Sequence, residues 1–364
     1  MMLGEAHSSR LLAQPISTSD VSRPLASVLR GAARGSLRAA AKFNIPARLQ
    51  RCLPANVAVL VYHRIGDPSE PGFYGFGSVV SATRPEFARQ LDYLKANCNV
   101  IGMRELLAWR RGEFELPANA VLITFDDGYR DNLTSAAPEL QARDLPAVLF
   151  LTSGFADGTL CFSWDWIAEA FKTTQLRSAK LPVLGDATWD SARQRSRIAA
   201  GWIAAGKGLD HRNFRRQMLA LATMLDVPPP SPAPRSVRLD WADIRALMTA
   251  GFAIGAHTAT HPILSRVSLQ RAAREIAVSR TAIERQIAAP VSCFAYPNGL
   301  FNEDHEKLVE QEGLELAFRA EGGVAFAGEI KRRPLAIRRI CISLKDDIPR
   351  FAAKVMGATR LMEW

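Results

Sequence analysis

Short apolar runs recur along the chain, and segments with helical periodicity separate them. The runs are rich in β-branched residues and carry no polar alternation, so they predict strands that are buried on both faces. They lie at residues 57–62, 121–125, 147–151, 252–256, 291–295, 316–318 and 337–342. Helical segments lie at residues 135–143, 241–249 and 269–287, and a further helix is opened by Thr83 as N-cap, with Phe87, Leu91 and Leu94 on its apolar face. This alternation predicts an α/β fold with a parallel sheet or barrel.

One stretch, residues 155–240, breaks the alternation between the third and fourth predicted strands. It contains helical periodicity near residues 164–171, 191–205 and 213–225 and ends in a run with five prolines between 228 and 234. We therefore predict an α-helical insertion with a stiff exit linker. The predicted organisation is a basic leader over 1–50, a barrel over 51–350 that the insertion interrupts, and a C-terminal tail over 351–364.

The formal net charge of +10 is concentrated near the start of the 364-residue chain. Residues 1–56 hold eight basic and two acidic residues, and only one aromatic residue, Phe43, lies among the basic ones, fewer than a single-strand nucleic-acid platform would require. We therefore expect no nucleic-acid partner. The five cysteines are odd in number and form no CxxC pair, which favours free thiols over a disulfide framework or a cysteine metal site.

No run of 18 apolar residues occurs, so no transmembrane helix is expected. The N-terminus also lacks the charged start, apolar stretch and small-residue cleavage site of a secretory signal, and the default expectation is a cytoplasmic protein. A weak amphipathic stripe within residues 25–37 could touch an anionic membrane surface. A loosely docked leader is the interpretation we favour.

The first candidate chemistry is the sequence TFDDGY, which directly follows the strand predicted at 121–125. Asp126 and Asp127 point in different directions at a strand end, so one can bind a metal while its neighbour handles protons. Gly128 allows a sharp turn away from the strand. Taken alone, the pattern is more typical of a capped Asp-Gly turn.

The second cluster is HTATH, which directly follows the strand predicted at 252–256. His257 and His261 can converge on one ion if the chain turns between them, and Pro262 ends the strand. With Asp127 they make a set of two histidines and one carboxylate, which suits Zn²⁺ with an open coordination position. The same donors serve other divalent ions, so the metal's identity is less determined than its site.

The third cluster is FAYPNG, which follows the strand predicted at 291–295 and reads as a turn that aims a backbone N–H at the site. Such a donor could stabilise an oxyanion. A plain Pro-Asn-Gly turn is the competing interpretation. Tyr129, Pro297 and Asn298, which flank the motifs, are candidate substrate-binding residues.

At these residues the chain resembles the polysaccharide deacetylases with a NodB homology domain, whose three motifs appear here as TFDDGY, HTATH and AYPNG. The resemblance implies a distorted (β/α) barrel of about seven strands. It also implies Asp126 as general base, Asp127, His257 and His261 as metal ligands, and the backbone amide of Tyr296 as oxyanion donor.

Two departures from the family pattern stand out. Many members carry an arginine two residues before the proline of the third motif, and this chain has Ala295 there, so Arg338 or Arg339 is the candidate replacement. Many also carry a general-acid histidine in a Leu-x-His near the C-terminus, which is absent here. His63, after the first strand, is the candidate in its place. Its setting resembles the poly-N-acetylglucosamine deacetylase subgroup, and in a closed barrel the first and last strands are neighbours.

The sequence therefore predicts a metal-dependent hydrolase that removes the acetyl group from an N-acetylglucosamine-containing oligo- or polysaccharide. An O-acetyl esterase acting on a sugar polymer such as xylan would use the same metal site. A carbohydrate-binding protein without catalysis is a further alternative, which the intact aspartates and histidines disfavour. Aromatic residues such as Trp164 could line a sugar groove.

Overall fold

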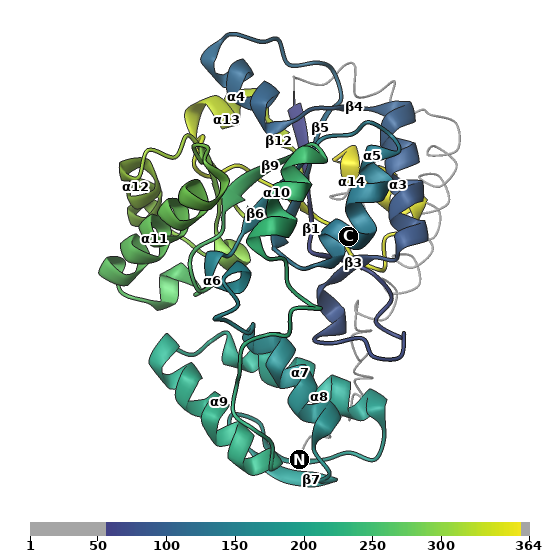
Figure 1. Cartoon of the computed structure of the whole chain (residues 1–364), viewed down its shortest axis with the longest axis vertical. Helices are drawn as coiled ribbons and strands as arrows, with labels where there is room; N and C mark the ends of the chain where they lie inside the picture. Colours follow the sequence, from purple (N-terminus) through teal and green to yellow (C-terminus); the bar gives the residue numbers. More distant parts are fainter. Residues whose placement is uncertain (1–55, 358–364) are drawn as a thin grey trace, which may run out of the picture.

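The computed structural model describes residues 56–357 of the chain (Figure 1). The leader predicted over 1–50, together with Cys52, lies outside the described residues. The four cysteines within them, Cys98, Cys161, Cys293 and Cys341, are free thiols.

A curved, mostly parallel sheet forms the centre of the molecule, in the order β11-β10-β9-β6-β5-β1-β12. The strong apolar runs found in the sequence are its strands. Their bounds are β1 Asn56–Tyr62, β5 Ala120–Asp127, β6 Ala147–Leu151, β9 Phe252–Ala256, β10 Cys293–Ala295 and β11 Leu316–Phe318. Short β4 (Asn99–Val100) pairs with β5, and β12 (Ala325–Phe326) runs antiparallel to β1.

Residues 337–341 connect the two ends of this sheet. Ile337 bridges Phe318 of β11, and β13 (Ile340–Cys341) pairs in parallel with Leu60 and Val61 of β1. The sheet thus curls into the distorted (β/α) barrel that the family resemblance implied, with β1 and β13 as neighbours. The last strand is shorter than predicted because only two of its residues pair with β1.

Both faces of the strands are buried, which explains why their sequences show no polar alternation. Alternate residues of β1 and β5 divide between two cores: Val57, Val59 and Leu122 face the inside of the barrel, whereas Leu60 and Ile123 face the surrounding helices. Asp126 has the inward parity of Leu122, since side chains alternate along a strand. The strand pattern therefore aims this carboxylate into the barrel.

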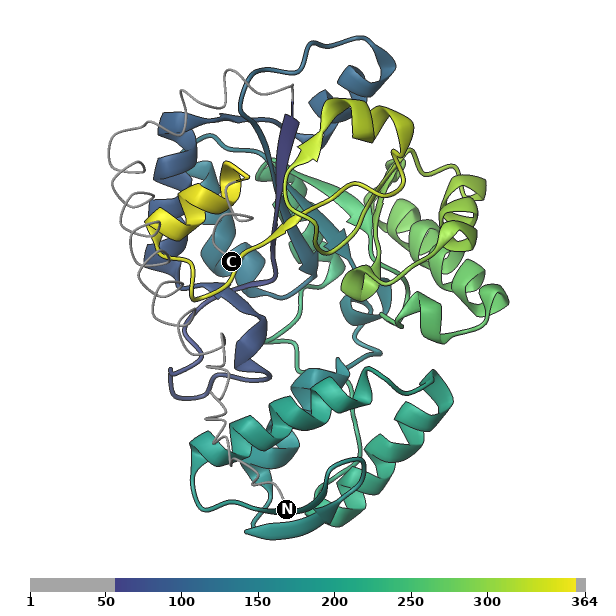
Figure 2. The same ribbon diagram turned by 180° about the vertical axis from the view of Figure 1, so that it is seen from behind.

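Helices cover the outside of the barrel (Figures 1 and 2). They are α3 Arg84–Asn97, α4 Met103–Arg111, α5 Ala137–Gln141, α6 Ser153–Ala156, α10 Trp241–Thr249, α11 Leu269–Ile287, α12 Glu303–Gln311, α13 Ala327–Arg332 and α14 Ile348–Val355. The Thr83 hydroxyl accepts a hydrogen bond from the Glu86 N–H at the start of α3, as its sequence predicted. Short β2 (Arg64–Ile65) and β3 (Val80–Ala82) pair beside the first strand.

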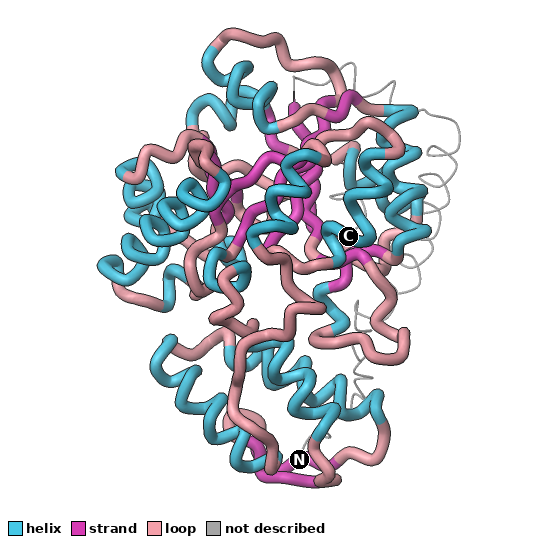
Figure 3. Tube along the Cα trace, viewed as in Figure 1, coloured by secondary structure: helices cyan, strands magenta, loops and turns pink. Residues whose placement is uncertain are grey.

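Residues 163–225, within the segment between β6 and β9, form a separate lobe, below the barrel in Figures 1 and 3. It consists of α7 Ser163–Thr173, β7 Ser178–Leu181, β8 Gly185–Thr188, α8 Ala192–Gly206 and α9 His211–Leu225. The hairpin of β7 and β8 was not predicted, because its polar, half-exposed residues give no apolar run. A core of its own, with Phe171, Trp189 and Trp202 at its centre, holds the lobe together.

The C-terminal boundary differs from the prediction. A tail was expected from residue 351, but α14 runs across that point from Ile348 to Val355. Phe351, Ala352 and Val355 are buried. The ring of Phe351 packs edge-on against that of Tyr93 in α3, with 5.9 Å between the ring centroids. The apolar residues of this short helix therefore pack against the barrel, and the helix is part of that domain. Among residues 56–357, no helix is long and apolar enough to span a bilayer.

Candidate active site

Asp126 and Asp127 end β5 on the rim of the barrel, and both are almost fully buried. The chain turns sharply there, because Asp127 adopts a left-handed φ of 78° and Gly128 one of 102°. A left-handed conformation is uncommon and strained for a residue with a side chain. This turn separates the directions of the two carboxylates.

The loop that carries the two histidines is also held in a strained form. Thr258 and His261 have φ values of 66° and 55°, and the Thr258 hydroxyl accepts a hydrogen bond from the His261 N–H at 3.0 Å. Glu275 of α11 accepts hydrogen bonds from both the N–H and the hydroxyl of Thr260, at 2.8 and 2.6 Å. This support could not be predicted from the sequence, since Glu275 lies in an ordinary helical pattern.

Asp127, His257 and His261 meet at one point. Each offers a ligand atom, and these atoms all lie within 4.8 Å of one another. Asp127 Oδ1 lies 3.7 Å from His257 Nε2 and 3.4 Å from His261 Nε2. The His257 Nδ1 atom lies 2.7 Å from the Ala295 carbonyl oxygen, which favours the tautomer that leaves Nε2 unprotonated for a metal.

The residues fit a divalent cation. Both Asp127 oxygens are buried without a hydrogen-bond partner among the described residues, a costly arrangement unless a cation satisfies them. Burial, and then the neighbouring Asp126 and Asp165 carboxylates, raise the pKa of Asp127 well above its usual 3.8. Burial lowers the pKa of both His257 and His261 below 6.5, which keeps the imidazoles neutral and able to bind a metal.

Arg339 holds Asp126 in a bidentate ion pair. Its Nη1 and Nη2 atoms donate to the two Asp126 oxygens, both at 2.7 Å, and its Nε donates to the Arg319 carbonyl at 2.8 Å. Burial acts to raise the pKa of Asp126, but the charges of Arg339 and His257 and the Arg339 hydrogen bonds outweigh it and lower this pKa. Of the two arginines that the sequence left open, Arg338 instead pairs with Glu329 at the surface.

His63 follows β1 and lines the same cavity as the aspartates. The hydroxyl of Ser81 accepts a hydrogen bond from its backbone N–H at 3.0 Å, and its carbonyl accepts one from Asn132 Nδ2 at 2.7 Å. Burial lowers the pKa of His63 to about 4, and Asp126 acts in the opposite direction. The backbone of His63 is thus fixed, while its ring faces the cavity with a carboxylate in electrostatic reach.

The turn after β10 departs from the prediction. The Tyr296 N–H, expected as the oxyanion donor, already donates to the Phe318 carbonyl of β11 at 2.9 Å, so the sheet uses it. Pro297 has no N–H, and the next amide is that of Asn298, a left-handed residue with φ of 55° that lines the cavity. No hydrogen bond of this amide is recorded within residues 56–357. The predicted oxyanion donor, the Tyr296 N–H, was therefore two residues too early, because the pairing of β10 with β11 is not visible in the motif.

Two further candidates for substrate contact do not reach the cavity. Pro297 is buried, and Tyr129 is fully buried with its hydroxyl bonded to Asp165 Oδ2 at 2.7 Å. The same hydroxyl accepts a hydrogen bond from Trp164 Nε1 at 2.8 Å. Tyr129 therefore orients Trp164, whose ring lies 4.9 Å from that of His261 and lines the cavity.

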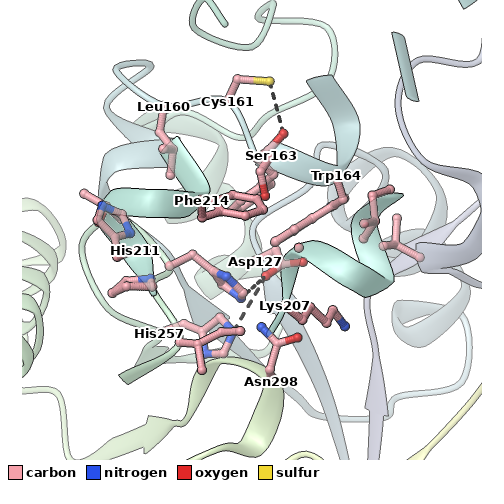
Figure 4. A pocket seen from close by; sticks show the side chains of 18 of the residues that line it. Asp127, Leu160, Cys161, Ser163, Trp164, Lys207, His211, Phe214, His257 and Asn298 are labelled. Atoms are coloured by element: carbon pink, nitrogen blue, oxygen red, sulfur yellow. Dashed lines mark hydrogen bonds and ion pairs between the residues drawn. The ribbon is translucent and has the colours of Figure 1, made fainter. Parts of the chain in front are cut away.

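A cavity of about 610 Å³ contains these groups and extends from the barrel rim to the inserted lobe. Figure 4 shows Asp127, His257 and Asn298 on its barrel side, with Trp164, Lys207, His211 and Phe214 from the lobe around them. A buried carboxylate with an arginine, two neutral imidazoles and a free amide can together support hydrolysis of an acyl group.

The chain is similar to a family of known proteins. The sequence profile of the family described as polysaccharide deacetylase matches residues 114–317. The chain is 19% identical over 273 residues to the Bacillus subtilis protein YxkH, a polysaccharide deacetylase homologue, and the match covers 75% of this chain and 67% of that one.

Solved structures share the fold. The Streptococcus pyogenes deacetylase PplD, in complex with acetate, is 16% identical with a TM-score of 0.55, over 83% of this chain and 99% of that one. IcaB from Ammonifex degensii is 18% identical with a TM-score of 0.53, over 83% and 97% of the two chains.

Proposed function

This chain belongs to the polysaccharide deacetylase family, and on that premise we propose that it is a metal-dependent enzyme that removes the acetyl group from an N-acetylglucosamine-containing oligo- or polysaccharide. The convergence of Asp127, His257 and His261, with Asp126 beside them, is the single observation that carries the proposal. Zn²⁺ is the metal we propose, because neutral imidazoles and one carboxylate are typical zinc ligands that leave a position open.

When bound, such an ion supplies Lewis-acid polarisation of the acetyl carbonyl and acidifies a water molecule. Asp126, which Arg339 keeps ionised, accepts the proton of the attacking water. The pairing with Arg339 weakens the carboxylate as a base but also fixes its direction. Preorganisation of this kind reduces the rearrangement needed in the transition state.

The Asn298 N–H donates a hydrogen bond to the carbonyl oxygen as negative charge develops on it. A donor of this type contributes about 10²–10³-fold to the rate. His63, at the end of β1, donates a proton to the leaving nitrogen, so that acetate and a free amine are released. The ring of Trp164 closes the cavity on the side of His261 and packs against the sugar or its acetyl methyl group.

Acetate release from defined substrates tests this function. Metal-replete protein is incubated with chitooligosaccharides, poly-N-acetylglucosamine oligomers and acetylxylan, and acetate and free amine are both measured. We expect acetate and amine in equal amounts from at least one N-acetylated substrate. Acetate without amine, from acetylxylan alone, would support the O-acetyl esterase instead.

A carbohydrate-binding protein without catalysis is the remaining alternative. It predicts retained sugar binding by the metal-replete protein and no acetate from any substrate. The ion pair of Arg339 with Asp126 weighs against it, because a buried pair of charges aimed at a cavity costs desolvation energy and has no purpose in simple sugar stacking.

A further inference from the structure

The part of the cavity that lies beyond the candidate catalytic residues is lined by positive charge. Lys207 and Arg215 reach it from the inserted lobe, and Arg266 and Arg271 reach it from the barrel side. Lys207, Arg215 and Arg266 are exposed, and no ion pair of these three is recorded within residues 56–357. Arg271 lies 3.5 Å from Glu275, whose carboxylate also binds Thr260.

Within residues 56–357, only Arg271 of these four cations has a carboxylate partner, Glu275, which does not itself line the cavity. Among the described lining residues, the only acids are Asp126 and Asp127. Asp126 is neutralised by Arg339, and Asp127 belongs to the candidate metal site. The outer cavity therefore has a net positive potential, which attracts anions and raises their local concentration.

The cations come from separate elements and point into one space. Lys207 directly follows α8, Arg215 lies on α9, Arg266 follows the HTATH loop and Arg271 lies on α11. The charge of Lys207 acts on His63, which places it near the reacting end of the cavity. The charges of Arg215 and Arg271 both act on His211, which places the two guanidinium groups near that residue.

Apolar side chains of the lobe surround this charge. They are Ile203, Leu209, Phe214 and Met218. Apolar walls reduce the local dielectric constant, so an ion pair formed between them is stronger than one in open water. A neutral sugar chain gains no charge–charge attraction from this combination, whereas an anionic group does.

We propose that the inserted lobe and the barrel together form an anion-binding subsite, and that the substrate is an N-acetylated sugar with a phosphate or carboxylate group next to the acetylated residue. This proposal rests on the deacetylase function proposed above and specifies its substrate class. Arg215, Arg266 and Arg271 offer planar donors that match either oxyanion in bidentate geometry, and Lys207 supplies a point charge.

Substrate comparison tests the proposal. Acetate release by the zinc-loaded full chain is measured for neutral di-N-acetylchitobiose, for a disaccharide of N-acetylglucosamine and glucuronic acid, and for N-acetylglucosamine 1-phosphate. We expect kcat/KM for one or both anionic compounds to exceed that for the neutral one by about tenfold or more, as a charge-assisted contact provides. The glucuronide and phosphate arms distinguish the two sources of the anion. The preference should shrink at high ionic strength, because salt screens exposed charges.

Charge-removal variants locate the effect. In Lys207→Gln and Arg215→Gln, the ratio of kcat/KM for the anionic over the neutral substrate should fall about tenfold. Matched controls are Lys180→Gln on β7 and Arg212→Gln on α9, both exposed residues that do not line the cavity. These controls should keep the wild-type ratio.

The outcomes separate the two proposals. Equal kcat/KM for neutral and anionic substrates, or equal effects of Arg215→Gln and Arg212→Gln on the ratio, would overturn the anion-binding subsite and leave the deacetylase intact. Absence of acetate from every compound would overturn the deacetylase function and this subsite with it.

Discussion

The barrel side and the lobe side of the cavity are built in opposite ways. On the barrel side, the two aspartates and His257 are buried and lie at strand ends, and side-chain hydrogen bonds join Asp126 to Arg339 and His257 to Ala295. On the lobe side, Lys207 and Arg215 are exposed, and neither has an ion-pair partner within residues 56–357. Rigid groups suit bond-breaking chemistry, and unpartnered exposed cations suit recognition of a ligand that supplies the counter-charge.

This difference suggests a division of labour. The barrel rim carries the family's motifs and hence the reaction, whereas the lobe between β6 and β9 adds the groups that select the substrate. Site-bearing loops on a rigid scaffold commonly vary in this way. Two results would contradict this division of labour. One is a variant of a barrel residue named above that leaves catalysis unchanged, and the other is a variant at the contact between lobe and barrel that abolishes catalysis.

The largest expected effect is at the base. Asp126→Asn should lower kcat by about 10²–10⁴-fold, since proton abstraction by a positioned group contributes that much. Zinc binding should persist, because Asp127, His257 and His261 remain. Steady-state kinetics with metal analysis measures both. Wild-type kcat in this variant would remove Asp126 from the chemistry.

The next effect concerns His63. His63→Asn should lower kcat by about 10²-fold or more by removing the general acid. Only protonated His63 can donate a proton to the leaving nitrogen. Its contribution to kcat/KM therefore falls as pH rises through the pKa of His63. A pH profile should show this falling limb in the wild type and not in the variant. An unchanged profile would point to another proton donor.

Arg339 and Arg338 form a matched pair, since they are adjacent and only the first faces the barrel interior. Arg339→Met leaves Asp126 buried without its partner and should lower the free energy of unfolding by about 3–5 kcal/mol. Arg338→Met breaks a partly exposed pair with Glu329 and should cost about 1 kcal/mol or less. Urea denaturation of both variants measures this. Equal destabilisation of the two variants would show that the buried pair of Arg339 with Asp126 contributes no more to stability than the partly exposed pair of Arg338 with Glu329.

The smallest effect lies at Asp165, which joins the lobe to the barrel through Phe76 and Tyr129. Burial raises the pKa of Asp165 from 3.8 to about 6, and hydrogen bonds from Phe76 and Tyr129 act against this rise. The folded chain therefore holds the proton more tightly than the unfolded chain. The stability that this provides is present at low pH and is lost as pH rises through about 6.

The measurable consequence is a slope in stability against pH. Asp165 should cost the wild type about 2 kcal/mol between pH 4 and 7, since each unit of pKa shift is worth about 1.4 kcal/mol and part of the loss already falls below pH 4. Asp165→Asn cannot ionise, and its stability should change less over the same range. Parallel slopes for the two proteins in thermal or urea denaturation would contradict this assignment.

Much of the barrel was predictable because its strands are buried on both faces. Uninterrupted apolar runs such as VAVLVY and VLITF mark such strands, and the motifs follow them directly. The alternation of side chains along the last strand could also have distinguished Arg338 from Arg339. If Ile340 and Ile342 face the helices, Arg338 faces outward and Arg339 inward, as the structure has them.

Other features left no such signal. Whether the Tyr296 N–H is already hydrogen-bonded depends on which strand pairs with β10, and the motif does not specify that strand. The support of the HTATH loop by Glu275 and the charges of Lys207 and Arg215 depend on how separate helices pack. Polar residues on exposed helix faces have no periodic constraint, so their role becomes visible only in three dimensions.

Metal loading of the wild type and of Asp127→Ala tests the central claim most directly. Protein stripped with a chelator is titrated with Zn²⁺, and bound metal and acetate release are followed together. The account predicts one zinc per wild-type chain, with acetate release from an N-acetylated oligosaccharide rising in step, and neither in Asp127→Ala. Full acetate release by metal-free protein, or stoichiometric zinc with full activity in Asp127→Ala, would contradict it.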